Sequence, residues 1–457
     1  MADQQYIFEP TSGQAIPLSV RLGWGSGSVA MALMFQSISI LLLVYLTDHA
    51  GISAGLAGAL IGLSKIYDAV TDPLMGVISD RTRSRWGRRR PYLIAGGVVS
   101  ALAFVMLFSV GQIQDETLRI WVTGLSLILY ATGYTIFNVP YLTMPAEMTD
   151  DNQARSVLMS FRIAGIASGQ IISTVIGPLI IFYFGGGIVG HAVMSYLVAG
   201  LILTLSVITF VMTGKAPVAA RRQSSATVGL IGQVKLIWSN RPFIILLAVK
   251  LFQLMGLAVQ LAILPYVVVR VMGADYKLLS QFFLIYALVI LVAQPIWVRI
   301  VVGIGKRAGF ILSATILAIA GMSWLLVTAT EPMSLFLLRS LVLGFGAAGI
   351  LLAGQAMLPD VMEYDYLKNG LRREGVFAGL YTMFEKFAFA FGPVLVGLFL
   401  SYSGYDGNLP PGQSQGESAI NAIYLCASVI PFVLVAIAIG FMMNYTLTEE
   451  RLRSMHR

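Results

Sequence analysis

Long apolar segments follow one another along almost the whole chain, and this pattern constrains the fold more than any other feature. A bilayer crossing needs about 20 apolar residues, whereas only 11% of the 457 residues here are charged. Soluble domains usually carry about 25% charge. The pattern predicts an all-α membrane protein and excludes a transmembrane barrel, whose strands would alternate over short segments. Twelve helices are predicted, at 22–47, 52–79, 92–111, 118–147, 156–184, 189–213, 242–271, 276–301, 308–328, 333–361, 376–402 and 419–445.

A polar stretch at 214–241 divides these helices six and six. Each set of six also has a glycine and basic loop between its second and third helices, at 87–90 and at 303–307. Two six-helix halves with matching loops are typical of transporters built from repeats. We therefore expect an N-terminal bundle at 1–213, a middle loop at 214–241 and a C-terminal bundle at 242–457.

The formal charge of +8 is distributed unevenly over the loops. Basic residues gather between helices 2 and 3, 6 and 7, and 10 and 11, which all lie on one side of the membrane. Under the positive-inside rule this places both termini in the cytoplasm and makes the basic excess topogenic. The polar first twenty residues lack the pattern of a cleaved signal peptide. One cysteine and three scattered histidines predict neither a disulfide framework nor a zinc site, and no catalytic constellation indicates an enzyme.

Two carboxylates lie inside the second apolar segment, where an ionisable group in lipid costs at least about 2.5 kcal/mol. Asp68 and Asp72 are four residues apart and so share one helix face. Two neighbouring anions repel unless a sodium ion, a proton or a lysine neutralises them, and exchange among these is the basis of cation coupling. Pro73 follows directly and frees a carbonyl as a further oxygen ligand. The alternative is that Asp72 pairs only with the loop arginines.

Lys386 lies about ten residues into the eleventh segment, and a lysine at that depth needs an acidic partner. We expect this partner to be Asp68 or Asp72, with Lys386 holding the site together until a cation arrives. A pair with the adjacent Glu385 is less favoured, because neighbouring helical residues point to different faces. A purely structural role for Lys386 is the alternative.

Further polar side chains in apolar segments are candidates for binding a solute. Thr135 and Asn138 precede Pro140 in the fourth segment and suit a cation or a hydroxyl-rich ligand, although such residues also join helices to each other. Arg162 and Lys250 lie deep enough to meet a polar substrate, or they snorkel to the membrane surface.

Several of these residues belong to longer runs: 67–76, containing both acids, and 80–91, which reads Asp-Arg-Thr-Arg-Ser-Arg-Trp-Gly-Arg-Arg-Arg-Pro. Together with 134–140, Arg162, 360–364 and 381–386, these runs resemble the glycoside-pentoside-hexuronide:cation symporters, typified by melibiose permease, of the major facilitator superfamily. The extended loop before Gly87 is a specific mark of that family. The resemblance covers most of the chain in order and implies the major facilitator fold, with two pseudo-symmetric six-helix halves.

The resemblance also implies roles for individual residues. Asp68, Thr71, Asp72 and Thr135 would form the cation site, in which the two aspartates would ligate Na⁺ if sodium is the coupling ion. Arg162, Tyr381, Thr382 and Lys386 would line the central cavity. The sugar-binding acids of melibiose permease do not carry over, because Ala32 and Asn138 stand at their places. Melibiose is therefore not the expected substrate.

We expect symport of a sugar or glycoside with Na⁺ or H⁺ by alternating access. A cavity without those acids but with Arg162 and Lys250 favours an anionic sugar, such as a hexuronide or a sulfonated glycoside. The alternative is a cation-coupled carrier of lysolipids or other amphiphiles. No cofactor or nucleic acid is expected, and the predicted protein is a monomer in the inner membrane of a bacterium. Asp80, Arg88 and Arg89 are expected to form a cytoplasmic latch.

Overall fold

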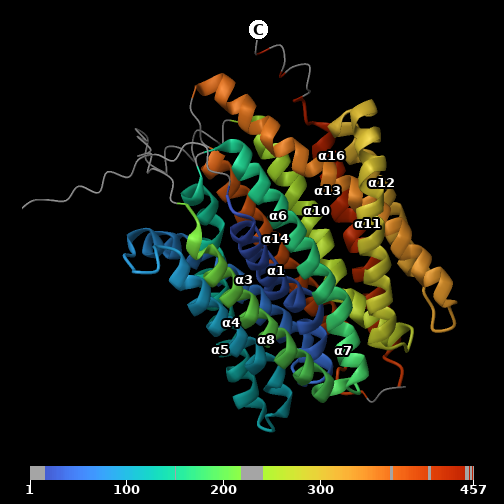
Figure 1. Cartoon of the computed structure of the whole chain (residues 1–457). Coiled ribbons are helices and arrows are strands. Elements are labelled where there is room, and N and C mark those ends of the chain that lie inside the picture. The colour runs from blue at the N-terminus through green and yellow to red at the C-terminus, as the bar shows by residue number, and fades with distance from the viewer. Residues whose placement is uncertain are drawn as a thin grey trace, which may run out of the picture.

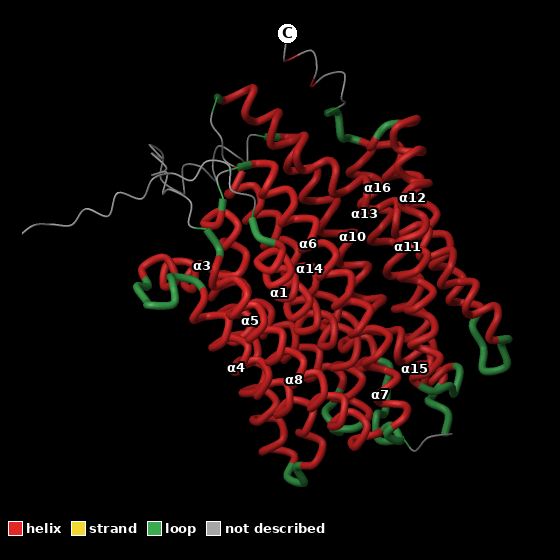
Figure 2. The backbone as a smooth tube through the Cα atoms, in the orientation of Figure 1, coloured by secondary structure: helices red, strands yellow, loops and turns green. Residues whose placement is uncertain are grey.

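The computed structural model describes residues 16–149, 151–217, 240–370, 374–409, 413–447, 452 and 455. These residues form a bundle of long helices that run side by side, joined by short loops (Figures 1 and 2). Most of the predicted middle loop, at 218–239, lies outside the described residues.

The first six predicted spans correspond to helices whose limits lie within a few residues of the prediction. They are α1 (Leu18–Ser37), continued by a π-helical turn and α2 (Leu43–Asp48); α3 (Ala54–Arg81); α4 (Arg90–Ser109); α5 (Glu116–Met148); α6 (Asn152–Ile171), continued by a π-helical turn and α7 (Gly177–Tyr183); and α8 (Gly187–Met212).

The remaining predicted spans are likewise helical. They are α10 (Arg241–Tyr266), continued by a π-helical turn to Val271; α11 (Tyr276–Ile304); α12 (Lys306–Met322); α13 (Met333–Asn369); α14 (Glu374–Tyr402); and α15 (Glu417–Tyr424), continued by a π-helical turn and α16 (Ile430–Met443).

Among the described residues, eleven helical segments are long and apolar enough to cross a membrane. The helix α3 is as long as these, at 28 residues, but it contains the charged side chains Lys65, Asp68 and Asp72 and is therefore less apolar. The eleven segments and α3 together correspond to the twelve predicted spans. The chain is an all-α, multi-pass integral membrane protein.

Local sequence signals explain where several helices begin and end. The side chains of Asp115, Asp151 and Asp275 accept hydrogen bonds from the first free backbone N–H groups of α5, α6 and α11. Asn240 does the same for α10, which carries a proline at its start, a position where the missing N–H costs nothing. Gly370 ends α13 in the left-handed conformation that favours glycine.

Small residues let the helices approach closely, as is usual in membranes. The clearest case is the contact between α3 and α14, which come from opposite ends of the sequence. A Cβ atom on Gly58 would clash with the Pro393 carbonyl oxygen and would lie 3.2 Å from the Gly397 Cα. This contact lies in the part of α3 nearer to Asp48, and we call that end of the bundle the Asp48 end. The opposite end, where α3 finishes, is the Asp80 end.

Candidate functional site

The two acids of α3 and the lysine of α14 meet midway along their helices. Lys386 Nζ lies 2.8 Å from Asp68 Oδ2 and also forms an ion pair with Asp72. Thr135 of α5 donates a hydrogen bond to each carboxylate, at 2.9 Å in the case of Asp72. Its hydroxyl lies 3.5 Å from that of Thr71. Three helices thus bring two carboxylates, two hydroxyl groups and one ammonium group into one cluster, with Asp68 buried and Asp72 partly exposed.

The contacts of Asp72 test the alternative that it pairs only with the loop arginines. Its carboxylate contacts Lys386 and Thr135 rather than the arginines of the 80–90 loop. The ammonium group of Lys386 occupies the space between the two acids, which is also where a bound cation would contact both. Among the described residues, no group of three or more histidine, cysteine or acidic side chains is arranged to hold a metal ion. The cluster therefore differs from a site for a tightly held transition metal. Carboxylate and hydroxyl oxygens suit a hard monovalent cation or a proton.

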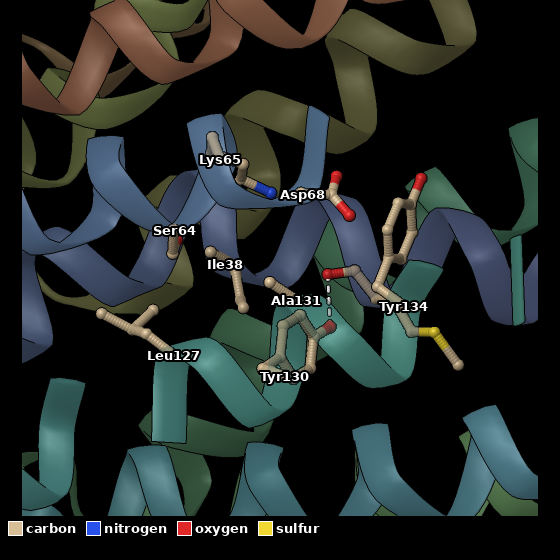
Figure 3. A pocket seen from close by; sticks show the side chains of 9 residues that line it. Ile38, Ser64, Lys65, Asp68, Leu127, Tyr130, Ala131 and Tyr134 are labelled. Atoms are coloured by element: carbon tan, nitrogen blue, oxygen red, sulfur yellow. Dashed lines mark hydrogen bonds between the residues drawn. The ribbon is translucent and has the colours of Figure 1, made fainter. Parts of the chain in front are cut away.

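A second lysine, Lys65, lies one turn before Asp68 on α3. A small cavity of about 10 Å³ separates it from α5 and is lined by Asp68, Tyr130 and Tyr134 among others (Figure 3). Such a volume is about the least that one water molecule requires. Lys65 Nζ also lies 4.7 Å from the centre of the Phe35 ring. Asp68 therefore shares this cavity with Lys65 and also forms an ion pair with Lys386.

A separate cluster joins α10 and α14. Lys250 Nζ lies 2.9 Å from Glu385 Oε2 and 3.4 Å from the centre of the Tyr381 ring. Lys250 is 9% exposed, so it is buried in the bundle instead of snorkelling to the surface. Glu385 therefore pairs with Lys250 and not with its neighbour Lys386. The hydroxyl of Thr382 bonds to the backbone of its own helix and joins neither cluster.

Arg162 and Asn138 stand apart from both clusters. Arg162 forms no ion pair with a described residue, and its Nε is buried without a hydrogen-bond partner among them. Asn138 is 3% exposed, and its side-chain oxygen is also buried without a hydrogen-bond partner among the described residues. Tyr134 borders the acid pair, since Lys386 Nζ lies 5.5 Å from the centre of its ring.

The predicted latch residues lie together at the Asp80 end. Arg89 is buried and pairs with Asp80 and with Glu147, at 2.8 Å from the latter, and it donates a hydrogen bond to Ser79. Arg88 also pairs with Glu147. These contacts tie the loop after α3 to the end of α5. The corresponding loop before α12 has the same arrangement, with Lys306 Nζ 2.7 Å from Asp360 Oδ2.

The Asp48 end has an ionic network that the sequence did not predict. Arg270, after α10, lies 2.8 Å from Asp48, and Tyr405, after α14, donates to the same carboxylate at 2.7 Å. The hydroxyls of Thr47 and Tyr266 lie 2.8 Å apart. The network thus joins the first span to the seventh span and to the loop after α14.

Signals for the missed residues were present in the sequence. Arg270 lies on the side of the membrane that otherwise has few basic residues, and such an exception indicates a structural or functional ion pair. Lys65 precedes Asp68 by three residues and therefore shares its helix face. The sequence disfavoured a pair between Glu385 and Lys386, but it did not identify Lys250 as the partner of Glu385.

A helical membrane bundle with opposite charges paired between helices at mid-depth has the architecture of a secondary transporter. The chain matches the family model described as MFS/sugar transport protein over residues 23–449. It belongs to this family and, within it, to the glycoside-pentoside-hexuronide:cation symporters, so it is a transporter and not an enzyme.

Comparisons with individual proteins agree with this assignment. The chain is 29% identical to the isoprimeverose transporter of Lactiplantibacillus pentosus, over 93% of this chain and 88% of the relative. It is 26% identical to a glucuronide carrier protein homolog of Escherichia coli, over 95% and 93%. A crystal structure of a bacterial homologue of the human lysosomal transporter Spinster, in an inward-facing conformation, has a TM-score of 0.70 at 11% identity, covering 95% of this chain and 97% of that one. The last comparison shows the shared fold.

Proposed function

We propose that this protein is a cation-coupled symporter that carries an anionic sugar or glycoside, of the hexuronide or sulfonated class, through a bacterial inner membrane. The observation that carries the proposal is Arg162, a guanidinium without an ionic partner among the described residues; the amide oxygen of Asn138 is likewise buried without a hydrogen-bond partner among them. An unpaired cation inside a membrane protein is costly and indicates a function. Guanidinium binds carboxylate and sulfonate groups through paired, charge-assisted hydrogen bonds.

In this proposal Asp68, Asp72, Thr71 and Thr135 bind the coupling cation in place of Lys386. Lys386 neutralises both acids before the cation arrives. The entering Na⁺ or H⁺ displaces the ammonium group, which releases α14 from α3. Because these two helices belong to the two proposed bundles, at 1–213 and 242–457, cation binding is linked to the movement of one bundle against the other.

From the distribution of basic loops we infer that the Asp80 end and both termini face the cytoplasm. The contacts at the Asp48 end then correspond to a conformation closed toward the outside. The residues Asp80, Arg88 and Arg89 serve as a latch at the cytoplasmic end in the opposite conformation. The similarity to a glucuronide carrier supports an anionic substrate, whereas isoprimeverose, the substrate named for the other relative, is uncharged.

Counterflow in proteoliposomes tests this proposal. The panel contains a neutral glycoside, a glucuronide, a sulfonated sugar and a lysolipid, each with and without sodium. We expect exchange of an anionic sugar, and sodium stimulation would identify the coupling ion. Exchange of the lysolipid alone would establish the alternative of an amphiphile carrier.

The role of Arg162 is tested with Arg162→Gln, which should lose exchange of the anionic sugar by about ten- to hundredfold because a charge-assisted contact is removed. Arg155→Gln on the same helix is the matched control, since Arg155 bonds to the Thr149 carbonyl near the Asp80 end. Equal exchange by wild type and Arg162→Gln would refute the role of Arg162 as the anion receptor.

A further inference from the structure

Glu385 has a place in the bundle that neither cation coupling nor anion binding explains. It lies in the middle of α14 beside Lys386, but it points toward α10, where Lys250 contacts its Oε2 atom. Its side chain is 41% exposed, whereas the side chain of Lys250 is 9% exposed. The ammonium group of the adjacent Lys386 lies 5.5 Å from the centre of the Tyr134 ring on α5. The carboxylate of Glu385 therefore lies one residue from the Lys386 ion pairs, on the side of α14 that faces α10.

Only half of this carboxylate is used within the protein. Lys250 engages Oε2, and Oε1 accepts no hydrogen bond from any of the residues that the structure describes. An ionised carboxylate has about four acceptor positions and no donor, so its natural partners are hydroxyl and N–H groups. Lys250 itself is fixed, because its ammonium group lies 3.4 Å above the Tyr381 ring. The cluster thus presents a carboxylate that is held in place through one oxygen atom and has a second oxygen atom free to accept hydrogen bonds.

We propose that Glu385 binds hydroxyl groups of the substrate and determines which sugar is accepted. This inference rests on the proposed function. Arg162 on α6 then binds the anionic group and Glu385 on α14 binds the hydroxyl-bearing face, so that one substrate bridges the two bundles. Lys250 and Tyr381 position the carboxylate.

The assignment also compensates for two positions without an acid, Ala32 on α1 and Asn138 on α5, which supply no carboxylate for hydroxyl groups. Glu385 supplies one from α14. A site that hydrogen-bonds a hydroxyl strongly rejects analogues without it, because the buried acceptor is then left unpaired.

The test uses binding of methyl β-D-glucuronide and its 2-, 3- and 4-deoxy analogues to the purified full-length protein in nanodiscs. Glu385→Gln should weaken binding of the parent sugar about ten- to hundredfold, as expected for the loss of a charge-assisted hydrogen bond. At least one deoxy analogue should bind equally to wild type and variant, since it lacks the hydroxyl that Glu385 contacts. Glu417→Gln, which changes an exposed carboxylate at the start of α15, should have no effect.

A second variant separates binding from support of the fold, because Glu385→Gln leaves Lys250 without its partner. The double variant Lys250→Met/Glu385→Gln removes both charges. If Glu385 only neutralised Lys250, the double variant would recover wild-type affinity, and this result would overturn the inference. Equal loss of affinity for all four sugars would overturn it as well. If wild type bound none of the glucuronides, the hexuronide class would be ruled out as substrate, and this inference, which is stated for that class, would fail with it.

Discussion

The two ends of the bundle use their charged residues differently. At the Asp48 end, an aspartate of the first span pairs with Arg270 of the seventh span and with Tyr405. At the Asp80 end, Arg89 pairs with Asp80 and Glu147 of its own set of six helices, and Lys306 pairs with Asp360 of the other set. The first network holds two sets of helices together, and the second holds each set rigid.

Exposure and helix packing follow the same division. The side chain of Asp48 is 2% exposed and that of Asp80 is 58% exposed. Along α14, a Cβ atom on Gly397 would lie 3.1 Å from the Gly58 Cα of α3, whereas one on Gly379 would meet nothing within 4 Å. The helices α3 and α14 are thus in close contact between Lys386 and the Asp48 end. We infer that the contacts that stabilise this conformation are concentrated at the Asp48 end. We also infer that α3 and α14 pivot against each other at the Lys386 ion pairs.

The largest effect should come from Arg270→Met. The substitution leaves Asp48 buried with hydroxyl partners but without its cation, and breaking a buried pair in this way costs about 3 kcal/mol or more. The closed Asp48 end should therefore open. The readout is maleimide labelling of an Ala54→Cys reporter in a Cys426→Ser background, since Ala54 is only 5% exposed in the closed end and Cys426 is buried.

We expect labelling of that reporter to rise about a hundredfold, the factor that corresponds to about 3 kcal/mol. Labelling of a Ser414→Cys reporter, at an exposed position on the same side, provides the reference rate. Arg270→Lys keeps the charge and should rise much less. Unchanged labelling in Arg270→Met would show that the Asp48 network does not hold this end closed.

A smaller but cleaner comparison is offered by two glycines exchanged for alanine. Gly58→Ala places a methyl group against the Pro393 carbonyl, and overpacking of this kind typically costs about 1–3 kcal/mol. Gly379→Ala, at the other end of the contacting helix, has open space around it and gains helix propensity. The first should increase reporter labelling about tenfold or more and the second should not. Similar labelling in the two variants would contradict the assignment of the close contact to one end.

Most of the fold followed from the sequence because the bilayer restricts the chain so strongly. The apolar runs located all twelve predicted spans, although α3 contains charged residues and is less apolar than the other eleven. The π-helical turns within several spans could not be predicted, because a single extra residue in a helical turn leaves no periodic signal over an apolar run.

The candidate site was only partly predictable. The grouping of Asp68 with Asp72 followed from helical periodicity, and the partner of Lys386 followed from the need to pair a buried charge. The partner of Lys250 could not be predicted in this way, because its identification requires knowing which helices are neighbours. The same holds for Asp48 and Arg270, which are 222 residues apart in sequence. Contacts between distant spans depend on packing, which a single sequence does not reveal.

The pH dependence of the Asp48 end gives a third prediction. His49 lies beside Asp48 and Arg270, with its ring centre 4.9 Å from that of His191 and 6.2 Å from that of Tyr45. Burial lowers the pKa of His49 from its ordinary value of 6.5, and Arg270 lowers it further, whereas Asp48 opposes the shift. A histidine that is hydrated in the open form therefore takes up a proton at a higher pH than in the closed form.

The closed form should consequently lose stability as the pH falls below about 6.5, and the loss should level off once the pH is below the lowered pKa. Labelling of the Ala54→Cys reporter, relative to Ser414→Cys at each pH, should rise over this window. His49→Gln removes the titrating group and should flatten the profile. A profile that is the same with and without His49 would assign the pH dependence to other groups.

The smallest effect should come from Asp80→Asn, the counterpart of an exchange at Asp48. Asp80 is largely exposed, and exposed ion pairs contribute about 0–1 kcal/mol. Arg89 keeps its ion pair with Glu147, at 2.8 Å, and its hydrogen bond to Ser79, so its charge stays compensated. Reporter labelling at the Asp48 end should change less than about fivefold. Asp48→Asn, which leaves the Arg270 guanidinium without its acid, should change it far more. If Asp80→Asn opened the Asp48 end as strongly as Asp48→Asn, the two networks would be coupled through the bundle and the latch would already act in this conformation.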